Sequence, residues 1–326
     1  RLDLADDSIE ENRNVMYLTV SPDGVCANDV VLLLHGLNEK WWTKYLPWAH
    51  RIATETKRPV VLVPIAFHMD RSPAEWSTPR MMAAVSRRRR EHYTGLLESS
   101  LANAALSTRL EQHPARLFWS GVQSYNDVVH IVKRIRAGKD HSIRKCDGID
   151  FFGYSIGVLL AQVLLMTDPH GVFADSWLFA FCGGAVMTGM NPVSRYIMDG
   201  HAYSALRRYF LEHDTAETKA ALPAAMIDTR EGRAFTGMLG GELFRAEREA
   251  AMRALAPRIH AVAMARDTVV PAAAVRDTLE DATVDTIDPP FAYSHENPFP
   301  SREPENAVDA AFDYVMRAAV DHLARG

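Results

Sequence analysis

Short, continuous apolar runs separated by helix-like segments are the feature that most constrains the fold of this chain. Val-Val-Leu-Leu-Leu at 30–34 and Pro-Val-Val-Leu-Val-Pro at 59–64 are apolar at every position. Such strands are buried on both faces, which is typical of parallel sheets covered by helices on both sides. Residues 41–54 between them have helical spacing. These two runs and the intervening segment therefore predict a βαβ unit.

The same alternation continues to the C-terminal end of the sequence and predicts an α/β protein with a doubly wound, mostly parallel sheet. Further strands are expected at 15–20, 148–152, 175–181, 259–265 and 283–287. Further helices are expected at 125–136, 158–166, 272–279 and 305–324. Two segments interrupt this rhythm. We expect a mainly helical insertion at about 67–121 and a Met-rich helical cap at 185–256, on a core formed by residues 1–184 and 257–326.

Composition narrows the classes of function that the chain can have. Of its 326 residues 48% are hydrophobic, which is enough for a full core without disulfides or metals. The formal net charge of −5 argues against general nucleic-acid binding. The longest mainly apolar run, at 158–166, is much shorter than the roughly 20 residues of a membrane span. Cys26, Cys146 and Cys182 form no CxxC pair, so we expect a reducing compartment and a cytoplasmic location.

The segment Gly153-Tyr154-Ser155-Ile156-Gly157 is the strongest catalytic motif in the sequence. It follows a predicted strand directly and opens an apolar helix, which is the context required of a nucleophile elbow. Glycine at both flanking positions relieves the crowding of a strained strand-to-helix turn. The turn presents the serine hydroxyl at the carboxyl end of the sheet, where open α/β sheets bind ligands. We therefore predict that Ser155 is a nucleophile.

A serine hydroxyl needs a base to accept its proton and an acid to orient that base. In this architecture the chain order is nucleophile, acid, histidine. Asp267 follows the predicted strand at 259–265, and His295 follows the strand at 283–287. Both therefore belong to the same edge of the sheet as Ser155. We predict Asp267 and His295 as the partners; Asp285 and Asp288, in or at the end of the last strand, are weaker candidates for the acid.

The loop His35-Gly36-Leu37-Asn38 follows the first strong strand and is the expected source of an oxyanion donor. We predict the backbone N–H groups of Leu37 and Ile156 as the two donors. A structural role for His35, fixing this loop by hydrogen bonds, is favoured over a role as base. Four residues near the elbow and this loop are candidates for the substrate pocket, although Trp41 could equally be a core aromatic: His35, Asn38, Trp41 and Tyr154.

These motifs together give the chain a resemblance to the α/β-hydrolase superfamily. The resemblance rests on His-Gly after a strand, Gly-Tyr-Ser-Ile-Gly, Asp-Thr-Val-Val-Pro and Ser-His-Glu-Asn, and it covers approximately residues 28–66 and 122–324. The segments Leu-Asn-Glu-Lys-Trp at 37–41 and Pro-Ile-Ala-Phe-His-Met at 64–69 look like a bacterial branch of that superfamily without an assigned function. The resemblance implies chemistry on serine and does not name a substrate.

We therefore predict hydrolysis of a carboxylic ester or thioester through an acyl-enzyme, with a small-molecule acyl substrate that could be linked to a carrier. An acyltransferase with the same triad and a non-catalytic binding protein on the same fold remain alternatives. Product analysis with an acceptor distinguishes the first alternative, and fluorophosphonate labelling distinguishes the second. The spacing of residues predicts no metal site and no cofactor. Whether two chains form a homodimer stays open.

The basic run Arg87–Arg90 has two interpretations. A solvated helix face is favoured, and a site for an anionic carrier group is the alternative. The methionines of residues 185–256 could line an adaptable acyl pocket or simply pack the helices of the cap.

Overall fold

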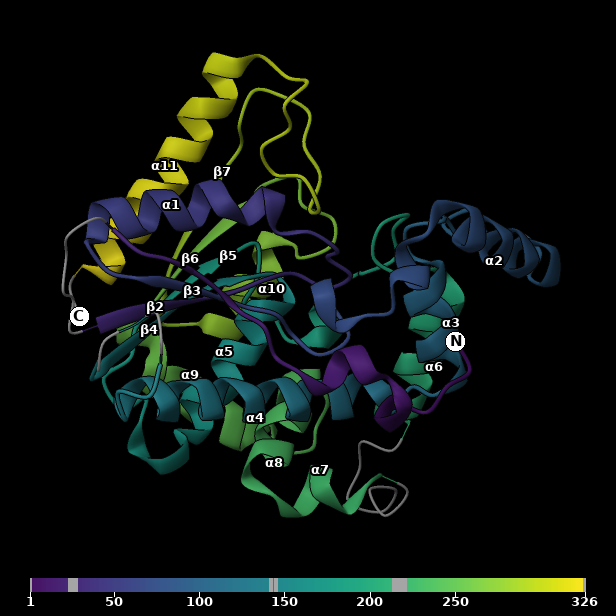
Figure 1. The fold of residues 1–326 in the computed structure, drawn as a ribbon, viewed down its shortest axis with the longest axis horizontal. Coiled ribbons are helices and arrows are strands. Elements are labelled where there is room, and N and C mark those ends of the chain that lie inside the picture. The colour runs from purple at the N-terminus through teal and green to yellow at the C-terminus, as the bar shows by residue number, and fades with distance from the viewer. Residues whose placement is uncertain (1, 23–28, 141–142, 144–145, 213–221, 325–326) are drawn as a thin grey trace.

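In the computed structural model, which describes residues 2–22, 29–140, 143, 146–212 and 222–324, the strands form one seven-stranded sheet (Figure 1). The sheet order is β1-β3-β2-β4-β5-β6-β7, with β1 antiparallel to β3 and every other neighbouring pair parallel. The strands span Leu18–Val20 (β1), Asp29–Leu34 (β2), Val60–Val63 (β3), Gly148–Tyr154 (β4), Leu178–Phe181 (β5), Ile259–Met264 (β6) and Thr283–Ile287 (β7). The predicted doubly wound, mostly parallel sheet is thus confirmed.

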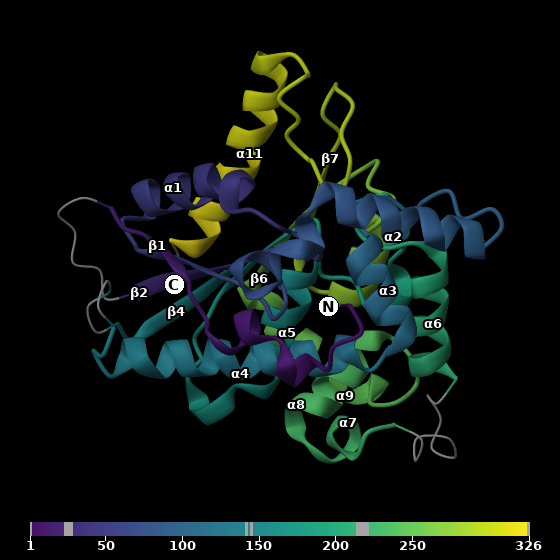
Figure 2. The ribbon, with the colours of Figure 1, turned by 45° about the vertical axis from the view of Figure 1, so that its right-hand side comes forward.

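The central strand β2 shows why continuous apolar runs are required here. Its even-numbered residues Val30, Leu32 and Leu34 belong to one hydrophobic cluster, and its odd-numbered residues Val31 and Leu33 belong to another. Successive side chains of a strand point to opposite faces, so each cluster fills the space on one side of the sheet. Helices α1 (Tyr45–Thr56) and α11 (Glu305–Leu323) cover one face (Figures 1 and 2).

The opposite face is covered by α4 (Arg116–Arg136), α5 (Ile156–Thr167) and α10 (Ala272–Leu279). Helix α4 begins nine residues before the predicted start at 125, because Leu117 and Phe118 continue its buried apolar stripe. Glycine suits position 121 within the helix because a Cβ atom there would lie 2.6 Å from the ring of Phe235.

The 67–121 segment contains α2 (Pro79–His92) and α3 (Ala104–Gln112), and the 185–256 segment contains α6 (Gly200–Leu211), α7 (Ala224–Asp228), α8 (Arg230–Leu239) and α9 (Arg245–Leu255). Helix α6 packs against α3, and these two lie with α2 at one end of the molecule (Figures 1 and 2). Helices α8 and α9 instead pack against α5 of the core. The 185–256 segment is thus shared between two regions, and its description as one separate cap stays a prediction.

The basic run lies on α2, and its members have different surroundings. Arg87, Arg88 and Arg90 are exposed, as expected for a solvated helix face. Arg89 is buried and donates from Nε and Nη2 to the two carboxylate oxygens of Asp199, at 2.7 and 2.8 Å. It also forms an ion pair with Glu111. The interpretation as a solvated face is therefore wrong for Arg89, which joins α2 to α3 and to the N-terminus of α6.

Two of the three cysteines lie in the described part of the chain. Cys146 and Cys182 are buried, and Cys26 lies outside the described residues.

Candidate active site

The turn between β4 and α5 places Ser155 in a strained backbone conformation. Its φ is 55° and its ψ is −122°, a region that side-chain-bearing residues rarely adopt. A Cβ atom at position 153 would lie 2.8 Å from Cα of Val158, and one at position 157 would collide with the carbonyl oxygen of Leu34. Both flanking glycines are therefore required for the turn to close against the neighbouring backbone.

The structure brings Ser155, His295 and Asp267 together at the carboxyl edge of the sheet. Oγ of Ser155 lies 2.7 Å from Nε2 of His295, and Nδ1 of His295 lies 2.7 Å from Oδ2 of Asp267. All three residues are buried, with 7%, 5% and 5% of their surface exposed. A nucleophile, a base within hydrogen-bond reach and an acid that orients the base are the parts that serine catalysis needs.

The second carboxylate oxygen of Asp267 is held by its own loop. Oδ1 accepts hydrogen bonds from the backbone N–H groups of Val269 at 2.8 Å and Val270 at 3.0 Å. These bonds fix the plane of the carboxylate, so that Oδ2 faces the imidazole. The carboxylate of Asp267 is therefore held in one orientation by its own loop.

The weaker acid candidates have other partners. Asp285 lies 2.9 Å from Nε2 of His260, and Asp288 accepts a hydrogen bond of 2.7 Å from Nε of Arg266. Neither carboxylate contacts His295 in the described part of the chain.

The loop after β2, which we call the oxyanion loop after the role predicted for it, is built around His35. Nε2 of His35 accepts a hydrogen bond of 3.0 Å from the N–H of Ile65, and Nδ1 lies 2.8 Å from the carbonyl oxygen of Gly36. The ring is fully buried, and this burial lowers the pKa of His35 to about 3. A neutral imidazole that uses both nitrogens in this way holds the loop in place; His35 lines none of the cavities described below.

Leu37 and Ile156 border the space next to Ser155. Both residues line the same two apolar cavities, one of which also contains Ser155 in its wall. Across the described ranges, neither of their N–H groups donates a hydrogen bond to a protein acceptor. Two free donors beside a nucleophile are what an oxyanion requires.

The remaining residues predicted for the substrate pocket have three different placements. The side-chain amide of Asn38 donates to the carbonyl oxygens of Ala102 and Tyr196, and Asn38 lines the rim of two cavities. Trp41 is 68% exposed and lines an open cleft, so it is not a core aromatic. Tyr154 is buried; its hydroxyl donates to the carbonyl oxygen of His295, and its ring stacks on the imidazole. Tyr154 is thus in a position to orient the base.

Sequence reasoning missed a group of supporting residues close after the oxyanion loop. Lys44 donates a hydrogen bond of 3.1 Å to the carbonyl oxygen of Glu296, next to His295, and forms an ion pair with Glu39. The hydroxyl of Tyr45 accepts a bond of 3.0 Å from the N–H of Gly36. These contacts tie the oxyanion loop and the histidine turn to one another. No motif marks such residues, and proximity to the His-Gly loop is the one signal that could have indicated them.

Comparison with known proteins assigns this chain to a family. The model of DUF6051, described as a family of unknown function, matches residues 1–324. The chain belongs to DUF6051. Among curated proteins, none has a significantly similar sequence.

Solved structures with a similar fold include a monoacylglycerol lipase of Paleococcus ferrophilus and Est1E of Butyrivibrio proteoclasticus bound to ferulic acid. The lipase has a TM-score of 0.50 at 10% identity, over 95% of the DUF6051 chain and 99% of its own. Est1E has a TM-score of 0.50 at 9% identity, over 95% and 96%. These likenesses show that the DUF6051 chain has the α/β-hydrolase fold. Within the described residues, no helix has both the length and the apolar character needed to cross a membrane.

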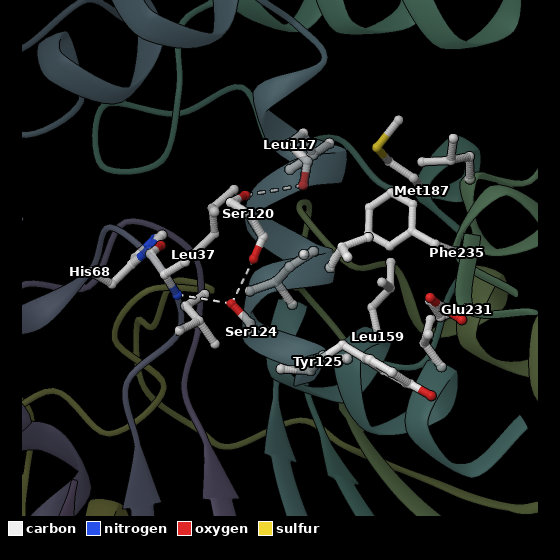
Figure 3. A pocket seen from close by; sticks show the side chains of 18 residues that line it. Leu37, His68, Leu117, Ser120, Ser124, Tyr125, Leu159, Met187, Glu231 and Phe235 are labelled. Atoms are coloured by element: carbon white, nitrogen blue, oxygen red, sulfur yellow. Dashed lines mark hydrogen bonds between the residues drawn. The ribbon is translucent and has the colours of Figure 1, made fainter. Parts of the chain in front are cut away.

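Two apolar cavities of the DUF6051 chain meet at Leu37 and Ile156. The first lies beside α4, α5 and α8 and has a volume of about 60 Å³. Figure 3 shows Leu37 and His68 on one side of it and Phe235, Glu231 and Tyr125 on the other. The second cavity adjoins Ser155, and methionines from the 185–256 segment form part of its wall: Met187, Met190 and Met198. The site therefore opens onto space that suits an apolar group.

Proposed function

We propose that this chain is a serine hydrolase that cleaves a carboxylic ester or thioester through an acyl-enzyme. The observation that carries the proposal is the continuous hydrogen-bonded series from Ser155 through His295 to Asp267. The two free N–H groups beside Ser155 and the apolar cavities that begin there add support. The name of one protein of similar fold, a monoacylglycerol lipase, fits this class of reaction.

The reaction begins when Oγ of Ser155 bonds to the carbonyl carbon of the substrate and its proton passes to Nε2 of His295. The electron pair of the carbonyl double bond moves onto oxygen, where the N–H groups of Leu37 and Ile156 stabilise the negative charge. Asp267 accepts a hydrogen bond from Nδ1–H and stabilises the imidazolium. When the tetrahedral species collapses, the alcohol or thiol leaves with the proton of His295, and Ser155 remains acylated.

Water then repeats the sequence on the acyl-enzyme. His295 takes a proton from water, the hydroxide equivalent adds to the acyl carbon, and collapse returns the proton to Ser155 while the carboxylic acid leaves. The burial of all three side chains strengthens their interactions, because little water competes for the hydrogen bonds.

The proposal is tested by fluorophosphonate labelling and by hydrolysis of 4-nitrophenyl esters of increasing acyl length. We expect Ser155→Ala to abolish labelling and to lower kcat/KM by several orders of magnitude, roughly 10³ or more. Ser120→Ala is the matched control, because Ser120 lies in the wall of the neighbouring cavity. Within the described residues, its hydroxyl donates a hydrogen bond only to the carbonyl oxygen of Leu117. If folded Ser155→Ala protein retained wild-type hydrolysis, the proposed mechanism would be wrong.

A further inference from the structure

A third cavity adjoins the first apolar cavity, with which it shares Leu37 and His68, and it is rich in positive charge. We call it the basic cavity. Leu37 and Asn38 form one wall of it, and Phe67 and Trp76 form part of another. The charged residues that line it are three cations and one carboxylate: Lys40, Arg109, Arg116 and Asp6.

Both arginines of the basic cavity are fully engaged. Asp6 forms ion pairs with Arg109 and with Nε of Arg116, the latter at 3.0 Å. Arg109 also donates to the carbonyl oxygens of Leu2 at 2.9 Å and Leu4 at 3.2 Å, and its guanidinium lies 4.6 Å from the centre of the Trp76 ring. The single carboxylate is thus shared by two guanidinium groups, which both contact its Oδ1, and it makes no recorded contact with Lys40.

Lys40 differs from these arginines because no carboxylate holds its ammonium group by a hydrogen bond, although the charge of Glu39 lies near it. In the described residues its ammonium group makes no hydrogen bond and no ion pair, although the side chain is half-buried. The neighbouring carboxylate of Glu39 is occupied by Lys44 and by the hydroxyl of Tyr45. His68, the remaining titratable residue in the wall, accepts a hydrogen bond of 2.8 Å from the N–H of Asn38, and burial lowers its pKa well below the usual value. The basic cavity therefore has an excess of positive charge.

The position of Lys40 connects this charge to the reaction. Lys40 also lines the open cleft that runs from Leu37 to Glu296, the residue after the catalytic histidine. A substrate whose carbonyl oxygen lies at the N–H of Leu37 has Lys40 three residues further along the same loop. A half-buried ammonium group that makes no hydrogen bond has lost part of its hydration, and a bound anion offsets that loss through a charge-assisted hydrogen bond.

We propose that Lys40 binds a carboxylate or phosphate group of the substrate and thereby makes the site selective for anionic esters. This inference rests on the proposed function, since it assumes that Ser155 attacks an ester held at Leu37. The anion can belong either to the acyl group or to the leaving group, and the two arms of the test separate these sources.

The first arm compares 4-nitrophenyl hexanoate with the mono-4-nitrophenyl ester of adipic acid, which has the same six-carbon acyl chain ending in a carboxylate. The second arm compares phenyl hexanoate with the hexanoyl esters of 4-hydroxybenzoate and of 4-hydroxyphenyl phosphate. In each arm the measured quantity is the ratio of kcat/KM for the anionic ester to kcat/KM for the neutral ester. We expect the native chain to prefer the anionic member in one of the two arms.

Lys40→Met keeps the length of the side chain and removes its charge, so it should lower that ratio by about 10- to 100-fold, mainly through KM. Lys40→Arg should restore most of the ratio, and Lys139→Met, at an exposed lysine, should leave it unchanged. A ratio that is the same in the native chain and in Lys40→Met overturns the inference while leaving the proposed function intact. If the native chain hydrolyses none of the esters, or Ser155→Ala hydrolyses them equally well, the proposed function itself fails.

Discussion

The two hydrogen bonds to Oδ1 of Asp267 make Asp267→Asn the sharpest test of the catalytic geometry. An asparagine at this position has one oxygen and one NH₂ group to distribute between the backbone and the imidazole. The N–H groups of Val269 and Val270, at 2.8 and 3.0 Å, require an acceptor. The amide oxygen must therefore stay with the backbone, and the NH₂ group must face Nδ1 of His295.

The opposite orientation of the amide is strongly disfavoured. It would point the NH₂ group at two N–H donors and leave both without an acceptor, at a cost of roughly 1–3 kcal/mol for each buried donor. With NH₂ facing Nδ1, that nitrogen must act as an acceptor, so the ring proton moves to Nε2. Nε2 then donates to Ser155 instead of accepting its proton.

The consequence is a base in the wrong tautomer at an otherwise unchanged site. Losing general-base assistance in this way lowers kcat by roughly 10⁴-fold near pH 7, as in the corresponding change of a serine protease triad. The assay is kcat and KM for a 4-nitrophenyl ester. KM and the unfolding midpoint are expected to change little, because the substitution preserves size and the backbone hydrogen bonds.

Asp285→Asn is the matched control, because Asp285 contacts His260 and Tyr314 and does not contact His295 in the described part of the chain. It should retain kcat to within about 2-fold. An Asp267→Asn enzyme that kept more than a tenth of the native kcat would refute the assignment of Asp267 as the residue that fixes the tautomer of His295.

Two further predictions concern stability. Burial lowers the pKa of His35 from about 6.5 to about 3, so its neutral ring contributes fully to the free energy of unfolding above pH 6.5. This contribution is lost as the pH falls toward 3, and the loss at pH 5 is about 2 kcal/mol. In urea unfolding, His35→Gln should therefore lose about 2 kcal/mol less between pH 7 and pH 5 than the native chain; equal losses would contradict the explanation. Arg89→Met should cost about 3–5 kcal/mol, because it leaves the carboxylate of Asp199, which has no exposed surface, without its bidentate partner. Arg87→Met, at the exposed position two residues earlier, should change the unfolding free energy by less than about 0.5 kcal/mol, and similar losses in both variants would argue against a special role for Arg89.

The sheet, and the meeting of Ser155, Asp267 and His295 at its edge, could be predicted because both depend on local sequence and on chain order. A strand buried on both faces has to be apolar throughout, as at β2 and β3. The parallel arrangement then collects the residues that follow β4, β6 and β7 at a single edge of the sheet. Ser155, Asp267 and His295 follow those strands, so chain order was enough to select them among many serines, aspartates and histidines.

The residues that support the triad could not be predicted, because their roles depend on contacts between distant segments. Tyr154 is part of the elbow motif, yet its contact with His295 joins positions 141 residues apart. Arg89 looks like its exposed neighbours in sequence, and only the approach of Asp199 from 110 residues away makes it a buried ion pair. The start of α4 at Arg116 was not predicted, and the ring that packs beside its Gly121 belongs to Phe235, from a distant segment of the chain.

The structure also changes where selectivity for the substrate should be sought. The sequence pointed to the 185–256 segment, whose methionines do line the pocket beside Ser155. Leu37, however, lines that pocket, the apolar cavity beside α4 and α5, the basic cavity and the open cleft. The residue predicted to donate to the oxyanion therefore stands where all four spaces meet, held in place by hydrogen bonds to the neighbouring Gly36 and Asn38. Because one short loop fixes both the oxyanion donor and the position of Lys40, the orientation of the ester carbonyl and the choice of its substituents should be coupled.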